Sequence, residues 1–120
     1  MHNFKKLKVY DRAIDFATSV YRITDKFPPS ELYGLTSQLR RAACSIALNI
    51  AEGSGNPGGR EFARFLDFSI RSGYECVACC EIANRVGYLD EIVAKGIIDE
   101  VEEIISMLVG LKRSVRAIHS

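Results

Sequence analysis

Clusters of lysine and arginine are the residues of this chain best suited to a binding chemistry, because such side chains hold the phosphate groups of nucleic acids. The formal net charge is only +1, so binding would depend on local patches rather than on a field over the whole protein. One cluster lies near each end of the chain, and two more lie within predicted helices. The candidate nucleic-acid-binding residues are Lys5, Lys6, Lys8, Arg12, Arg40, Arg41, Arg60, Arg64, Arg71, Lys112, Arg113 and Arg116.

Two interpretations of these cations are open. If they bind RNA or DNA phosphates, the first and last clusters could merge, because a chain of four alternating helices brings its two ends to one end of the bundle. Alternatively, the cations solvate helix surfaces and pair with acids, and Asp67 and Glu75 lie close to the arginines of the third predicted helix. The chain contains no zinc-finger or RNA-recognition consensus, so sequence-specific readout is not expected.

The polar pair Asn49 and Glu52 lies on the flank of the second predicted helix, three residues apart. Buried there, each side chain would need a hydrogen-bond partner. We expect the pair to tie this helix to a neighbouring helix or subunit. A catalytic role for Glu52 is the alternative, but no second acid, nucleophile or metal ligand is placed to join it, so we expect no enzymatic activity.

The four cysteines do not form a recognisable metal or redox motif. Cys76, Cys79 and Cys80 include one C-x-x-C, but it lies in the middle of a predicted helix, whereas a redox C-x-x-C usually opens a helix beside a sheet. A structural zinc site usually needs four ligands, and Cys44 falls on the side of its own helix opposite the core. Both histidines are near the termini. We expect small core residues, with no metal and no cofactor.

Four helices must position all of these residues. Apolar residues repeat by three and four along the chain, which is typical of bundle helices, and no segment has the alternation of a strand. Pro28-Pro29, the glycine-rich run from Gly53 to Gly59 and Gly87 to Asp90 interrupt the pattern, and Ser30 is expected to cap the second helix. The predicted ranges are Leu7 to Asp25, Ser30 to Gly53, Gly59 to Arg85 and Glu91 to Ile118. The sequence therefore predicts a single all-α domain over residues 1–120, an antiparallel up-down-up-down four-helix bundle.

The second predicted helix is apolar on more than one side. Its core stripe consists of Leu32, Leu35, Leu39, Ile46 and Ile50. The opposite side carries Cys44, Ala47, Leu48 and Ala51. A helix that is apolar nearly all round is usually buried on both sides, which predicts a contact with a second subunit. The alternative is that these are the scattered apolar residues found on any protein surface.

The composition is that of an ordinary globular protein. Hydrophobic residues make up 48% and charged residues 26% of the 120 positions, which is enough apolar material for one core. No apolar run reaches the length of a membrane span, and the N-terminal residues do not resemble a signal peptide. We therefore expect a cytoplasmic protein without a membrane partner, with its cysteines reduced.

Blocks along almost the whole chain carry a resemblance to a known family. They are Leu7-Lys8-Val9-Tyr10, Phe27-Pro28-Pro29, Tyr33 to Ala43, Ser45 to Gly53, Glu61 to Leu66 and Gly87-Tyr88-Leu89. On these blocks the chain resembles the four-helix-bundle proteins encoded in intervening sequences of bacterial 23S ribosomal RNA genes. The resemblance implies a left-handed bundle that assembles into a ring-like homopentamer.

A related branch, the accessory variability proteins of diversity-generating retroelements, binds nucleic acid through basic surfaces and partners a reverse transcriptase. This chain departs from the family in its loop Asn56-Pro57-Gly58-Gly59, where members often carry a basic residue. That departure argues against a phosphate contact by the loop itself. From the resemblance and the basic clusters, we expect a non-enzymatic homo-oligomer that associates with RNA or DNA through basic surfaces, and a reverse transcriptase or another protein is a further candidate partner. The alternative is a structural or protein-interaction adaptor that does not bind nucleic acid.

Overall fold

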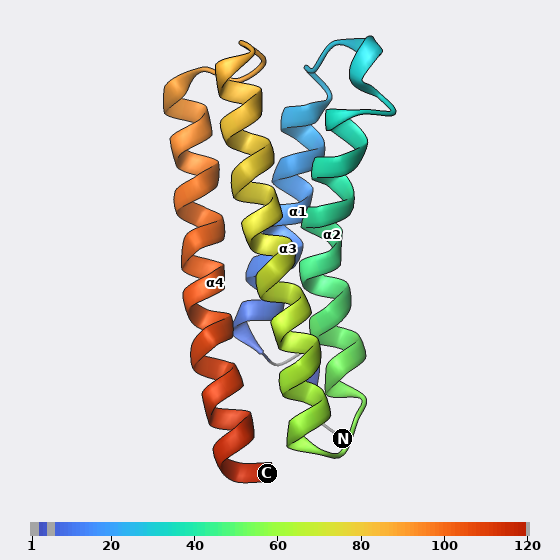
Figure 1. Ribbon diagram of the computed structural model, residues 1–120, viewed down its shortest axis with the longest axis vertical. Helices are drawn as coiled ribbons and strands as arrows, with labels where there is room; N and C mark the ends of the chain where they lie inside the picture. The colour runs from blue at the N-terminus through green and yellow to red at the C-terminus, as the bar shows by residue number, and fades with distance from the viewer. Residues whose placement is uncertain (1–2, 5–6, 120) are drawn as a thin grey trace.

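The computed structural model describes residues 3–4 and 7–119, and in these residues the only regular elements are helices. The four long helices alternate in direction along one axis, so that the chain passes up, down, up and down (Figure 1). The bundle measures 45 × 23 × 19 Å. The elements are α1 (Lys8–Thr24), the 3-10 turn η2 (Pro29–Glu31), α2 (Leu35–Ser54), α3 (Gly59–Arg85) and α4 (Glu91–His119). The predicted all-α, up-and-down bundle is confirmed, and its handedness stays a prediction.

The helices pack most closely with their neighbours in sequence. Contacts are most extensive between α2 and α3 and between α3 and α4, whereas α1 and α4 touch each other least. Arg12 bridges that sparse seam. Its guanidinium donates to Glu100 at 3.0–3.1 Å and to Glu103 at 3.0 Å, so one side chain of α1 holds two carboxylates of α4.

The start of α2 differs from the prediction. Ser30 does not cap this helix; it lies inside the short turn η2, and α2 begins only at Leu35. The reason is Glu31, whose carboxylate accepts the Leu35 amide at 3.0 Å and the Tyr88 hydroxyl at 2.8 Å. These two hydrogen bonds hold the pKa of Glu31 below its ordinary value. Leu32 is consequently in the turn and 48% exposed, so its assignment to the core was wrong.

The core contains most of the apolar stripe predicted for α2, and the buried face of this helix is wider than expected. Leu39, Ile46 and Ile50 of α2 are fully buried, as predicted. Ala47 is also buried, because α2 packs against both α1 and α3 and its buried arc therefore spans two contacts. The prediction that Ala47 lies on an outer face was wrong.

The long helix α3 has the bounds that its sequence predicts, and its small residues allow close packing. Ser69 is buried and donates its hydroxyl to the Ile46 carbonyl of α2 at 2.9 Å. A Cβ on Gly73 would lie 2.7 Å from Cγ1 of Ile105, so the glycine allows α4 to pack closely against α3. Phe65 is only half-buried and packs edge-on against Phe68, with their ring centroids 5.7 Å apart.

No helix in the described ranges is both long and apolar enough to cross a membrane.

Candidate nucleic-acid interface

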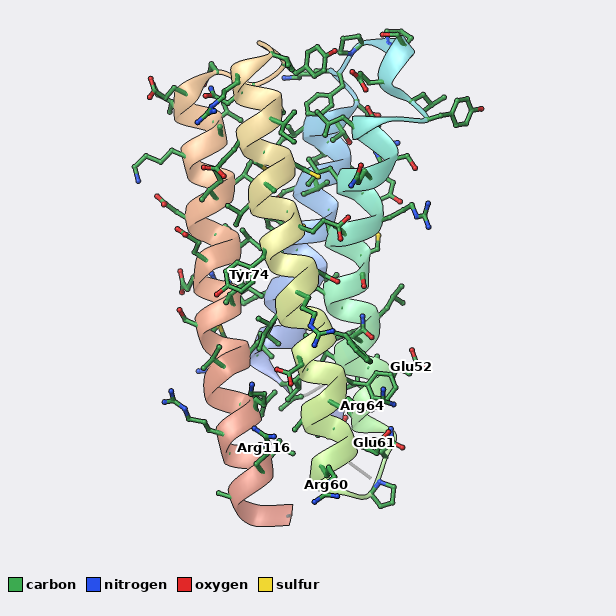
Figure 2. The ribbon with its side chains drawn as sticks, in the orientation of Figure 1. Glu52, Arg60, Glu61, Arg64, Tyr74 and Arg116 are labelled. Carbon is green, nitrogen blue, oxygen red and sulfur yellow. The ribbon has the colours of Figure 1, made fainter. Side chains whose placement is uncertain are left out.

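The ends of α3 and α4 form a basic corner, defined here as Arg60, Lys112, Arg113 and Arg116. Lys112 of α4 donates to Asp67 of α3 at 2.8 Å, so these two residues lie at the same level of the bundle. Arg60 precedes Asp67 by seven residues and Arg116 follows Lys112 by four, distances of about 10 and 6 Å along the helices. Both arginines therefore lie beyond this ion pair, and Figure 2 shows them at the same end of the bundle.

Three arginines of the basic corner are exposed and are not paired with an acid among the described residues. Arg60, Arg113 and Arg116 are exposed. Within the described residues, none of them forms an ion pair with an acid. The nearest labelled acids, Glu52 and Glu61, lie on the α2 side of this end, away from Arg116 (Figure 2). The corner can therefore offer several cations to a polyanion at once.

Other predicted binding residues are already paired with acids. Arg12 bridges Glu100 and Glu103, and Arg40 bonds to Asp25 at 3.0 Å, to the Thr24 hydroxyl at 2.7 Å and to the Tyr21 carbonyl at 3.4 Å. Because these partners cancel the local charge, such cations contribute less to an anion-binding surface than unpaired ones.

Arg64 is paired in the same way. Its guanidinium bonds to Glu61 at 3.0 Å and lies 5.1 and 5.2 Å from the ring centroids of Phe65 and Phe68. The hydrogen bond from Arg64 lowers the pKa of the Glu61 carboxyl, as the bond from Arg12 does for Glu103. Glu61 therefore stays ionised to lower pH and keeps Arg64 neutralised.

Three further predicted cations are exposed on α1, α2 and α3. Lys8 is exposed at the first turn of α1, Arg41 is exposed on α2, and Arg71 is exposed with its guanidinium 5.7 Å from the Phe68 ring. Lys5 and Lys6 lie outside the described residues. Of the N-terminal cluster, Arg12 is directed to the acids of α4. The merger of the N-terminal and C-terminal clusters stays a prediction.

The residues predicted to lie at a subunit interface have different environments. Leu48 is 64% exposed in the middle of α2, while Cys44 and Ala51 are half-buried. Asn49 donates to the Ser45 carbonyl and hydroxyl, both at 2.9 Å, and Ser45 in turn accepts the Ser72 hydroxyl of α3 at 2.9 Å. Asn49 thus connects α2 to α3 through Ser45.

Glu52, the other member of the predicted polar pair, is exposed and forms no ion pair or side-chain bond within the described residues. It does not tie α2 to a neighbouring helix of the same chain. Its carboxylate is labelled at the lower end of α2 in Figure 2, pointing outward.

The cysteines of α3 are core residues, as predicted. Cys76, Cys79 and Cys80 are each at most 3% exposed. Burial, with a smaller effect of neighbouring charge, raises the pKa of Cys80 to about 12 and raises the pKa of Cys76 as well. These thiols stay protonated at neutral pH and are poor nucleophiles and metal ligands. In the described part of the chain, no three His, Cys, Asp or Glu residues are grouped in a way that could hold a metal ion.

A groove that the sequence did not indicate runs between the N-terminal half of α2 and α3. It has a volume of about 570 Å³ and is lined by polar side chains, among them Ser37, Gln38, Arg41, Ser72 and Glu75. The residues on α2 could have been noticed as a polar strip at helical spacing. Their partners on α3 could not, because only the packing of the two helices sets Ser72 opposite Ser45.

Comparison with known proteins places the fold and the family. No curated protein matches this chain significantly. A crystal structure of a protein of unknown function from the S23 ribosomal protein family of Bacteroides thetaiotaomicron is similar, with a TM-score of 0.78 at 20% sequence identity. The match covers 87% of this chain and 97% of the other, and at this identity it shows a shared fold. The model of the 23S rRNA-intervening sequence protein family matches residues 5–110, so this chain belongs to that family.

Proposed function

We propose that the protein is a non-catalytic, homo-oligomeric, RNA- or DNA-associated protein that binds the phosphate backbone through its basic corner. The observation that supports this most is the set of three exposed arginines, Arg60, Arg113 and Arg116, that have no acid partner in the described residues. The family name refers to the intervening sequences of 23S ribosomal RNA, which makes structured RNA the first probe to use.

The chemistry of the corner suits a backbone contact rather than base readout. Exposed arginines at helix ends reach phosphates without a fixed geometry, and each phosphate that is neutralised releases a counterion. Several copies arranged in an oligomer would present several corners, and each further contact then forms at high effective concentration. A modest patch on one chain can therefore give useful affinity in an assembly.

The absence of catalysis is part of the proposal. Glu52 is exposed and stands apart from any partner within the described chain, and the three cysteines of α3 are buried with raised pKa values. Neither arrangement resembles an activated acid, base or nucleophile.

Charge reversal tests the basic corner. The double variant Arg113→Glu and Arg116→Glu is expected to bind labelled structured RNA and duplex DNA at least tenfold more weakly than the wild type. For the duplex, the slope of log affinity against log salt should fall by about 2, because about two phosphate contacts are lost. Fluorescence anisotropy over a salt series measures both quantities.

The matched control is Arg22→Glu with Lys26→Glu. These two exposed cations lie at the end of α1, at the opposite end of the bundle, and their reversal changes the net charge and the charge at a helix C-terminus by the same amount. Equal weakening in both variants would contradict a specific corner. If the wild type did not bind at low salt, the nucleic-acid function would be wrong and the adaptor would be favoured.

Self-assembly is proposed to use the outer face of α2 around Leu48. Replacing Leu48, which is 64% exposed, with aspartate is expected to reduce the mass in solution from an oligomer, five times 13.4 kDa for a pentamer, to that of one chain. Light scattering after size exclusion measures this mass. Ile92→Asp, at an 86% exposed site on α4, is the control and should leave the mass unchanged. A Leu48→Asp variant with the wild-type mass would exclude this face.

A further inference from the structure

We infer that the groove between the N-terminal half of α2 and α3 binds a nucleotide unit, with its phosphate on Arg41 and Ser37 and its base against Tyr33. This site goes beyond the proposed function, because it lies on other residues than the basic corner, along the N-terminal half of α2 and the middle of α3. The same chemistry could come from a free mononucleotide or from one unit of a single strand.

The first observation is the shape of the site. The groove of about 570 Å³ adjoins a second hollow of about 270 Å³ on the α1 side of α2, and Tyr33, Ser37 and Arg41 line both. These three residues therefore form a ridge between the groove and the smaller hollow, and the two together make one continuous surface. The volume of the larger groove is within the range of small-molecule sites, about 300–1,000 Å³.

The second observation is the chemistry of the ridge. Tyr33 is 93% exposed, so nearly its whole ring is open to a flat partner. Arg41 is exposed and forms no ion pair among the described residues, in contrast to Arg40 beside it, which is held by Asp25 and lies 4.6 Å from the Tyr21 ring centroid. An open aromatic ring next to an unpaired guanidinium is the combination that binds bases by stacking and phosphates by charge.

The third observation is a set of polar groups on the ridge and in the two hollows beside it. Thr36 lines the smaller hollow and is 3% exposed, and its hydroxyl has no hydrogen-bond partner within the described structure. A buried hydroxyl without a partner is unfavourable, so a ligand that supplied one would be stabilised. Ser37 and Gln38 add a hydroxyl and an amide at the adjoining positions of the groove.

The polarity of the groove sets the orientation of the ligand. Glu75 of α3 lines the side of the groove across from α2 and forms no ion pair among the described residues. Its carboxylate repels a phosphate and leaves the Arg41 side as the place for the anion. The base then lies toward Tyr33, where the ring is open and Gln38 can bond to a base edge.

Titration of the ¹⁵N-labelled protein with adenosine monophosphate, followed by NMR, tests the inference. Amide shifts are expected at residues 33–41 and 72–75, and Tyr33→Ala and Arg41→Gln should each weaken binding about tenfold. Tyr74→Ala is the matched control, because Tyr74 is 60% exposed but lies on the α4 side of α3 (Figure 2). Adenosine without phosphate should bind less tightly than the nucleotide.

Further ligands distinguish the sources and define failure. If an octa-adenylate single strand shifts the same amides at lower concentration than the mononucleotide does, the natural ligand is a strand. If the mononucleotide binds as tightly as the octa-adenylate, the natural ligand is a free nucleotide. Equal shifts from inorganic phosphate alone would overturn the role of the base. The absence of a shift at these amides with either nucleotide probe would overturn the inference. If the double variant Arg113→Glu with Arg116→Glu binds adenosine monophosphate as the wild type does, this site is separate from the basic corner.

Discussion

Replacing Phe16 with alanine is expected to lower the free energy of unfolding by about 3–5 kcal/mol, which is the usual cost of removing a buried aromatic ring. Phe16 is 2% exposed and is among the largest fully buried side chains of the described structure. It belongs to the hydrophobic core cluster, so its removal leaves a cavity among packed side chains. Domains of this size have a stability of about 5–15 kcal/mol, so this single change removes a large part of it.

Urea denaturation followed by circular dichroism measures the effect. The control is Ile14→Ala on the same helix, which removes an aliphatic side chain that is 41% exposed and should change stability by less than about 1 kcal/mol. A loss for Phe16→Ala as small as that of the control would mean that α1 is not part of the cooperative core.

Gly53→Ala is expected to lower the free energy of unfolding by about 1–3 kcal/mol, although alanine is the better helix former. A Cβ at this position would lie 2.5 Å from Cβ of Phe65 and 3.2 Å from Cδ1 of Phe62. The Phe65 Cβ is joined directly to the backbone of α3, so relief of the clash requires the end of α2 to move away from α3. The contact between α2 and α3 is the most extensive in the bundle, and moving the two helices apart exposes core side chains of both.

Gly110→Ala is the matched control for the effect of helix propensity. Gly110 lies in α4, and a Cβ there would meet no atom within 4 Å. We expect this variant to be stabilised by about 0.5–1 kcal/mol, so the two glycine variants should shift the urea midpoint in opposite directions. A Gly53→Ala variant as stable as Gly110→Ala would show that α2 and α3 can separate at no cost.

The local elements could be predicted from the sequence because their signals are local. The period of apolar residues and the breakers at Pro28-Pro29 and in the glycine-rich loop are enough to place four helices, and α3 has the predicted bounds. The small residues of α3 were also placed correctly in the core, since Cys76 and Cys80 share a face with its large apolar residues. Helical periodicity needs only neighbours three or four residues apart, and those are written in order along the chain.

Only the tertiary structure decided which surfaces remain available for binding. The pairing of Arg12 with Glu100 joins residues 88 positions apart, and the hydrogen bond between Tyr88 and Glu31 that accompanies the late start of α2 joins residues 57 apart. The burial of Ala47 and the groove between α2 and α3 likewise depend on the rotation and register of packed helices. A pattern within one helix shows which face is apolar, but the partner that each charge meets is set by how neighbouring helices pack, which is why the basic corner and the groove emerge only from the folded chain.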